Sequence, residues 1–158
     1  MSRFLALVLV AFVGCSSSDD GGGAGGAVAS TPLSGTFRGA SFAGKRAHAT
    51  RASPSQKLVD IVEADVGCAD SAKQKQGILV TVTWQTGYAR DFPGDGTTLA
   101  NAVLYYEENG APKNEVVSGG RVELVESSPE KGSKGRLRIR ALTRSSDLEG
   151  EIPLEVCD

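Results

Sequence analysis

The stretch Arg136–Val156, RLRIRALTRSSDLEGEIPLEV, decides the fold, because apolar and charged residues alternate along it on both sides of a polar turn. A period of two residues places alternate side chains on opposite faces of a β-strand. The stretch therefore predicts an antiparallel hairpin of strands 136–143 and 148–156. If residues 144–147 form a four-residue turn, Thr143 lies opposite Leu148.

This turn fixes the cross-strand pairs of the hairpin. On the apolar face we expect the pairs Leu137 with Leu154, Ile139 with Ile152, and Ala141 with Gly150. On the charged face we expect Arg136 with Glu155 and Arg140 with Glu151. Opposite charges paired in this way contribute roughly 0.2–1 kcal/mol each. A slip by one residue would expose the apolar row, so patterning and charge favour the same register.

The charged face carries an arginine stripe, Arg136, Arg138 and Arg140, that could suggest an anion-binding site. The glutamates of the neighbouring strand neutralise such a stripe, and we interpret the face as a solvated structural surface. Pro153 lacks an amide proton for a sheet ladder. It predicts that the last strand lies at a sheet edge or carries a bulge.

Short alternating segments occupy the rest of the chain from residue 35 onward. In the clearest, 78–85, the residues Ile78, Val80, Val82 and Trp84 share one face. The other expected strands are 35–38, 43–51, 58–64, 88–92, 99–107, 115–117 and 121–126. No helical period extends beyond about two turns. The expected strands number about nine or ten and predict an all-β fold. The architecture that we expect is a single-domain antiparallel β-sandwich over residues 34–158.

The chain begins with a segment typical of export. Arg3 precedes an apolar run, 4–13, that is too short to cross a bilayer, which needs about 20 residues, but suits a signal peptide. Residues 12–15, Phe-Val-Gly-Cys, resemble the lipobox of bacterial lipoproteins. That resemblance implies a signal peptide over 1–14 and a lipidated N-terminal Cys15. An ordinary secretory signal and a buried segment are the alternatives.

Residues 15–33 are rich in Ser, Gly and Asp, and they predict a flexible tether between the anchor and the domain. The tether contains Gly21, Gly23 and Gly26 in a G-x-G-x-x-G spacing. No expected strand precedes these glycines and no helix follows, so a dinucleotide site is not indicated. A net charge of −2 lacks the basic excess that nucleic-acid binding requires.

Three cysteines are present, and lipidation would use Cys15. The remaining pair, Cys68 and Cys157, predicts a disulfide in an oxidising compartment. Closing a loop of about 90 residues stabilises by up to about 4–5 kcal/mol in the chain-entropy model. The alternatives are a catalytic thiol or a metal site, and a metal would need more ligands than these cysteines and the single His48 supply.

Candidate catalytic residues are few. Alternation places His48 on the polar face of its segment with Arg46 and Thr50, which favours an exposed strand histidine over a general base. No G-x-S-x-G motif occurs. The acidic residues that could suggest paired catalytic carboxylates are Asp60, Glu63, Asp65 and Asp70. We interpret them as a solvated cluster, and we expect neither a catalytic residue nor a cofactor.

Two further patterns suggest binding sites. Asp91, Asp95 and Gly96 resemble a fragment of a calcium loop, but Pro93 occupies a ligand position and no glutamate closes the loop. We expect a turn there, and no metal. The aromatic candidates for a ligand patch are Tyr88, Phe92, Tyr105 and Tyr106. Single exposed aromatics are ordinary on protein surfaces, so this patch is a weak hypothesis.

The contexts of the two domain cysteines, Asp65–Ala69 (DVGCA) and Glu155–Asp158 (EVCD), together with the strand spacing, resemble small uncharacterised bacterial lipoproteins. The resemblance covers residues 35–158 and implies a β-sandwich without transferable catalytic residues. We therefore expect an exported, lipid-anchored envelope protein, a non-catalytic binding or structural module for an unidentified protein or glycan partner. Ser16 after Cys15 resembles the outer-membrane sorting context of Gram-negative cells. The alternative is a small secreted hydrolase or lipid carrier with a loop-borne site.

Overall fold

The computed structural model describes residues 26–53, 55–93, 102–126, 128 and 130–158. It is nearly all-β, as the alternation predicts. The elements are β1 (Ser34–Phe37), β2 (Ala40–Ala43), β3 (Arg46–Arg51), β4 (Gln56–Val62), α1 (Cys68–Ser71), β5 (Gln76–Thr83), β6 (Ala89–Phe92), β7 (Ala102–Glu108), β8 (Ala111–Val116), β9 (Gly119–Glu126), β10 (Lys134–Leu142) and β11 (Asp147–Val156).

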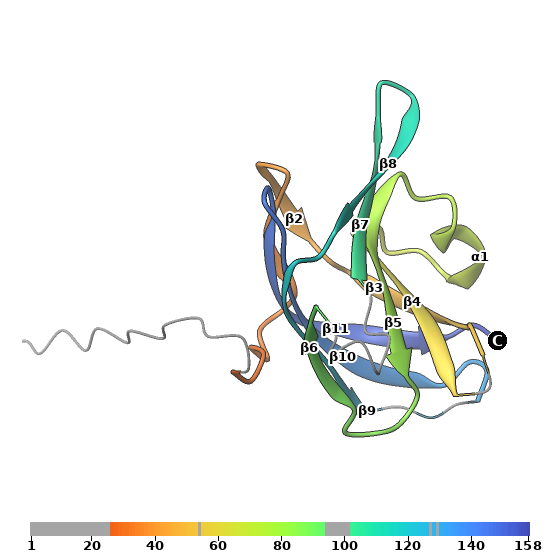
Figure 1. Cartoon of the computed structure of the whole chain (residues 1–158). Helices are drawn as coiled ribbons and strands as arrows, with labels where there is room; N and C mark the ends of the chain where they lie inside the picture. Colours follow the sequence, from red (N-terminus) through yellow and green to blue (C-terminus); the bar gives the residue numbers. More distant parts are fainter. Residues whose placement is uncertain (1–25, 54, 94–101, 127, 129) are drawn as a thin grey trace, which may run out of the picture.

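The strands form one mixed sheet in the order β6-β9-β10-β11-β3-β4-β5-β7-β8, and β1 and β2 extend it beside β11. Neighbouring strands are antiparallel except β11 and β3, which run parallel. The sheet curls on itself as a half-barrel, and the β7–β8 hairpin projects beyond it (Figure 1). The expected two-sheet sandwich is not confirmed, because hydrogen bonding continues from β6 to β8 through a single sheet.

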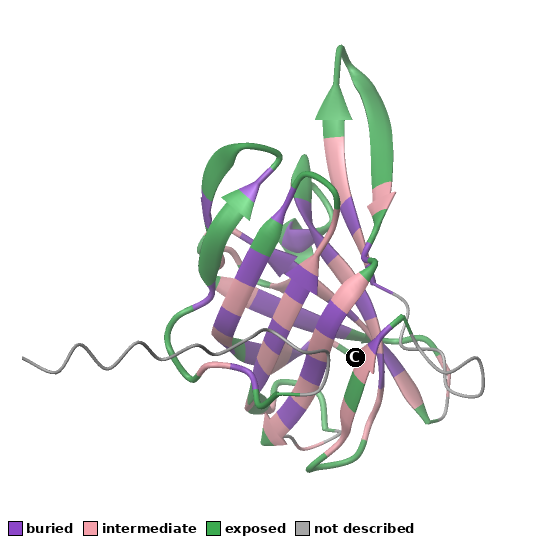
Figure 2. Ribbon diagram, turned by 60° about the vertical axis from the view of Figure 1, so that its left-hand side comes forward, coloured by how far each residue is buried: buried purple, intermediate pink, exposed green. Residues whose placement is uncertain are grey.

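The core fills the concave side of the curled sheet. Buried and less buried residues alternate along the central strands, as Figure 2 shows. Fully buried members include Val59, Ile61, Ile78, Val80, Leu104, Val122, Leu124, Leu137, Ile139 and Ile152. The face predicted for 78–85 is confirmed for Ile78, Val80 and Val82, whereas Trp84 is only partly buried against the core.

The terminal hairpin forms with the predicted faces, but its predicted register is wrong by two residues. Leu137 lies opposite Ile152, and Ile139 lies opposite Gly150. The loop spans 143–146 and is closed by the amide of Thr143, which donates to the carbonyl of Ser146 at 2.9 Å. A shift of two residues preserves both faces, so the alternation alone cannot distinguish the two registers.

The arginine stripe pairs with glutamates, as expected for a structural face. Arg138 lies opposite Glu151 and contacts it at 2.8 Å. Arg140 pairs with Glu149 at 3.6 Å rather than with Glu151. Arg136 lies opposite Pro153 and reaches Glu151 at 3.3 Å, so the expected pair with Glu155 is wrong.

Pro153 does not mark a sheet edge, because β11 has neighbours on both sides. The amides of Glu151 and Cys157 donate to the carbonyls of Thr31 and Ala49, respectively. Residues 151, 153 and 157 direct their backbone nitrogens toward the same side of β11. The amide proton that Pro153 lacks would therefore point toward the N-terminal segment and β3. Pro153 lies where the neighbour of β11 changes from the N-terminal segment to β3.

The packed chain begins before the domain boundary expected at residue 34. Val28 is 4% exposed and Leu33 is 1% exposed, so the end of the expected tether belongs to the core. The amide of Leu33 donates to the carbonyl of Glu151 at 2.9 Å. Gly150 permits this approach, because a Cβ there would lie 2.5 Å from Leu33 Cα. Leu33 also packs on Gly44, which separates β2 from β3 and interrupts the single strand expected over 43–51.

The difference between the two faces of β10 predicts a difference in stability. Ile139→Ala should lower the free energy of unfolding by about 2–5 kcal/mol, because it leaves a void in the core. Arg138→Ala should cost less than about 1 kcal/mol, because its ion pair is partly exposed and screened. Urea melts of both variants measure this, and a larger loss for Arg138→Ala would contradict the assignment of faces.

Candidate functional site

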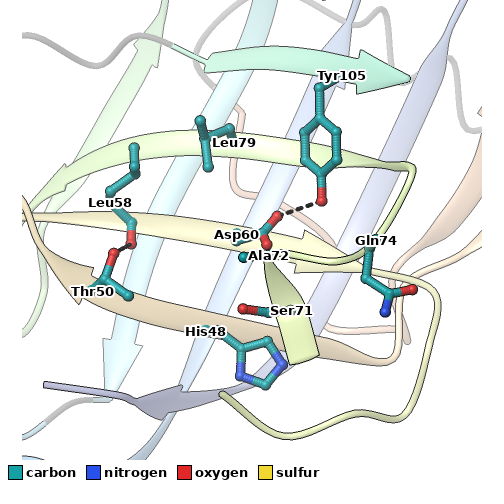
Figure 3. A pocket seen from close by; sticks show the side chains of 9 residues that line it. All are labelled: His48, Thr50, Leu58, Asp60, Ser71, Ala72, Gln74, Leu79 and Tyr105. Carbon is teal, nitrogen blue, oxygen red and sulfur yellow. Dashed lines mark hydrogen bonds between the residues drawn. The ribbon is translucent and has the colours of Figure 1, made fainter. Parts of the chain in front are cut away.

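A pocket of about 320 Å³ lies on the side of β3, β4 and β5 opposite the core, under the segment that contains α1 (Figure 3). The lining residues that come from strands alternate along the chain with core residues. His48, for example, lies between the buried Ala47 and Ala49. The lining residues are His48, Thr50, Leu58, Asp60, Ser71, Ala72, Gln74, Leu79 and Tyr105. The pocket is therefore a product of strand alternation and of the segment that covers it.

A disulfide holds that covering segment in place. Cys68 begins α1, and its sulfur lies 2.02 Å from that of Cys157, as the sequence predicts. The amide of Cys157 donates to the carbonyl of Ala49 at 2.8 Å, which fixes the end of the chain beside β3. Ser71 closes the short helix by donating to the carbonyl of Cys68 at 3.2 Å. The bond thus fastens α1 to the chain that runs beside β3.

His48 is fully buried, at 0% exposure, and the predicted exposed histidine is wrong. It does lie on the face opposite Ala47 and Ala49, as the alternation indicates, but α1 and the disulfide cover that face. Its Nδ1 lies 3.9 Å from the sulfur of Cys157. Its Nε2 is buried without a hydrogen-bond partner. Buried polar atoms are normally paired, so this nitrogen is an exception on a residue that lines the pocket.

Asp60 lies directly opposite His48 in the β3–β4 register. It is only partly exposed, and its carboxylate accepts a hydrogen bond from the hydroxyl of Tyr105 at 2.8 Å. Burial raises the pKa of Asp60, and the Tyr105 hydrogen bond opposes this rise. Burial and the same hydrogen bond raise the pKa of Tyr105 strongly. Asp60 therefore does not belong to a solvated cluster, unlike Asp65 and Asp70, which are exposed and ion-paired.

Tyr105 reaches Asp60 because a glycine lies between them. Gly77 pairs with Tyr105 across β5 and β7. A Cβ at Gly77 would lie 2.7 Å from the Tyr105 hydroxyl oxygen. Tyr106 points to the other face, where its ring meets Phe37 edge-on and Arg38 stacks 3.8 Å from the ring centre. The expected aromatic patch therefore does not form around both tyrosines, and only Tyr105 lines this pocket.

The remaining aromatic and acidic candidates lie elsewhere. Phe92 is buried in the core, and Tyr88 packs against that core. Asp91 forms an ion pair with Arg121 at 2.9 Å. Asp95 and Gly96, the rest of the suspected calcium loop, lie outside the described residues. Glu63 accepts a hydrogen bond from the amide of Ala43 at 3.0 Å.

Three residue types of a serine hydrolase, Ser71, His48 and Asp60, line the same pocket. A catalytic triad needs hydrogen bonds from serine to histidine and from histidine to the acid. Here Asp60 binds Tyr105, Ser71 binds a backbone carbonyl, and Nε2 of His48 has no partner. The arrangement offers binding groups and does not form a nucleophile–base relay.

A metal-like cluster also involves His48. The ligand atoms of His48, Cys68 and Cys157 lie within 4.8 Å of one another. The thiolate is the form of cysteine that binds metal, and both sulfurs are joined to each other. The cluster is therefore the predicted disulfide with a histidine beside it.

No family model, curated protein or solved structure matches the chain. The lipobox-like residues that end at Cys15 lie outside the described residues. Within the described ranges, no helix is long and apolar enough to cross a bilayer.

The raised pKa of Asp60 predicts a pH-dependent stability. The folded state holds this proton more tightly than the unfolded chain, where the pKa is about 3.9. The protonated carboxyl therefore favours folding at low pH, and this contribution is lost as the pH rises through the folded pKa. Relative to wild type, Asp60→Asn should become progressively more stable as the pH rises through this window.

Urea melts across the acid-to-neutral range measure this difference. The matched control is Asp65→Asn, which removes an exposed carboxylate outside the pocket. A difference between Asp60→Asn and wild type that stays constant with pH, or falls as the pH rises, would contradict the burial of Asp60.

Proposed function

We propose that the chain is a lipid-anchored envelope lipoprotein whose β-domain binds a small ligand in the pocket beneath α1. The observation that carries this proposal is the Nε2 atom of His48, which is buried, unpartnered and on a residue that lines the pocket. An unsatisfied buried polar group costs about 1–3 kcal/mol. A ligand that supplies the missing partner recovers this cost and fills the apolar space beside Leu58 and Leu79.

The pocket supports binding over the alternative of a hydrolase or lipid carrier. The hydrogen bonds of Ser71, His48 and Asp60 do not connect into a relay. The volume, about 320 Å³, lies at the lower end of the range of about 300–1,000 Å³ for small-molecule sites. That size suits a compact ligand better than the acyl chains of a lipid.

The position of the N-terminal segment is compatible with the proposed anchor. In Figure 1 the described chain begins at the side of the sheet away from α1. A lipid at Cys15, followed by a tether up to Val28, would hold the domain at a membrane from that side. The pocket would then remain accessible, so the domain could bind its ligand while anchored.

The anchor predicts a change in fractionation. Cys15→Ser should abolish incorporation of labelled palmitate and release the domain from the membrane fraction, because the lipidated atom is lost. The matched control, Ser17→Ala, alters the same segment and should stay with the membrane. Absence of labelled palmitate from the wild-type protein would contradict the lipoprotein proposal.

The pocket proposal predicts that a filled pocket loses its ligands. Ala72→Trp places a large side chain at a lining position, and Ala69→Trp adds the same side chain to α1 at an exposed position outside the lining. Compounds from a library of small fragments should raise the melting temperature of wild type and Ala69→Trp, because they bind the folded state. They should not raise that of Ala72→Trp. The pocket proposal fails if no fragment stabilises wild type, or if Ala72→Trp responds equally.

A further inference from the structure

Each of the three hydroxyls that line the pocket among the described residues donates to a protein acceptor. Tyr105 donates to Asp60 at 2.8 Å, and Thr50 donates to the carbonyl of Leu58 at 3.4 Å, as Figure 3 shows. Ser71 donates to the carbonyl of Cys68 at 3.2 Å. The amide nitrogen of Gln74 donates to the carbonyl of Asp70 at 3.1 Å. The three hydroxyls leave oxygen lone pairs for a ligand, and Gln74 adds its carbonyl oxygen and one remaining N–H.

His48 also offers an acceptor. Its Nδ1 faces the sulfur of Cys157, and a disulfide sulfur carries no proton. The only hydrogen bond possible between them runs from the Nδ1 proton to sulfur. In the neutral imidazole this leaves the lone pair on Nε2, the atom without a partner. In this tautomer the unsatisfied Nε2 requires a hydrogen-bond donor from the ligand.

The charge of the pocket also favours a ligand that donates hydrogen bonds, because the carboxylate of Asp60 lies in the lining. Of the lining residues that the structure describes, Asp60 is the one acidic residue, and none is Lys or Arg. Among the described residues, none of the ion pairs includes Asp60. His48 lies opposite Asp60, and a positive charge on its ring would lower the pKa of Asp60. With a neutral His48 ring the partly buried carboxylate has no cation beside it, and a cationic ligand offsets the cost of burying its charge.

The walls define the rest of the ligand. Leu58, Leu79 and Ala72 contribute apolar surface, and the ring of Tyr105 adds an aromatic face. A hydrated metal ion would gain little from such walls. A carboxylate would be repelled by Asp60 and would leave Nε2 of His48 without a donor. A neutral alcohol could donate one hydrogen bond but would leave the charge of Asp60 unpaired.

We propose that the pocket binds a small primary amine as its ammonium ion, with the N–H groups directed to Asp60 and His48 and an apolar body against the leucines. This inference rests on the proposed ligand-binding function and specifies its ligand class. It accounts for the excess of acceptors, the unpaired carboxylate and the apolar walls together.

Four probes of similar shape test the inference: benzylamine, benzyl alcohol, benzoate and benzyltrimethylammonium. Each is titrated into the oxidised protein at one pH and ionic strength, and binding is followed by amide chemical shifts of pocket residues. Benzylamine should bind about tenfold more tightly than benzyl alcohol, because its hydrogen bonds are charge-assisted. It should also bind more tightly than benzyltrimethylammonium, which has the charge but no N–H.

Two variants test whether Asp60 causes the tighter binding of benzylamine. Asp60→Asn keeps the shape and removes the charge, so benzylamine should lose its advantage over benzyl alcohol. Asp65→Asn, the matched control outside the lining, should retain it. If Asp60→Asn does not fold, the ranking of the four probes with wild type decides by itself.

The outcomes separate the ligand class from the binding function. If benzyl alcohol or benzoate binds as tightly as benzylamine, and Ala72→Trp blocks it, the pocket is a binding site and the amine inference is overturned. If neither these probes nor any library fragment binds at the pocket, the proposed function fails as well. An amine preference that survives Asp60→Asn would also overturn the assignment.

Discussion

The disulfide between Cys68 and Cys157 is the constraint on which the functional part of the structure depends. It joins two positions 89 residues apart and fastens α1 to the end of the chain beside β3. In the chain-entropy model a closure of this length stabilises by about 4–5 kcal/mol. Without it, the short helix has little to hold it over the sheet. The same bond therefore contributes to stability and holds in place the α1 segment, the roof that covers the pocket.

This roof changes the chemistry of the sheet face beneath it. On an open antiparallel sheet, polar residues such as His48 and Asp60 would be solvated. Under α1, His48 loses all contact with water and Asp60 loses part of it. Tyr105, placed across Gly77, satisfies one carboxylate oxygen. The result is a small polar site enclosed by apolar walls, on the side of the sheet that the core does not use.

Much of the sheet was predictable from sequence, since the alternation identified most strands and the faces of β10 and β11. The register of the β10–β11 hairpin was not predictable, because a shift of two residues leaves the same side chains on each face. Only the closure of the loop at Thr143 distinguishes the two registers. The continuity of a single curled sheet depends on pairings between distant strands, such as β11 with β3. The edge expected at Pro153 failed for the same reason, because the sequence does not reveal the change of neighbour.

The site was predictable only in fragments. The cysteine pair followed from counting, and Tyr105 was among the aromatic candidates. The burial of His48 depends on a tertiary cover that strand alternation cannot anticipate, and so does the separation of Asp60 from the exposed acids. The glycine that admits Tyr105, Gly77, gave no local signal, because its role becomes visible only when β5 and β7 are paired.

The most direct test of this account is the imidazole nitrogen spectrum of the oxidised protein at mildly alkaline pH. His48 is the only histidine of the chain, so its signals are unambiguous. We expect a neutral ring with the proton on Nδ1, and a lone pair on Nε2 whose resonance shifts when benzylamine is added. A proton fixed on Nε2, or the averaged tautomers of a solvent-exposed histidine that do not respond to the amine, would contradict it.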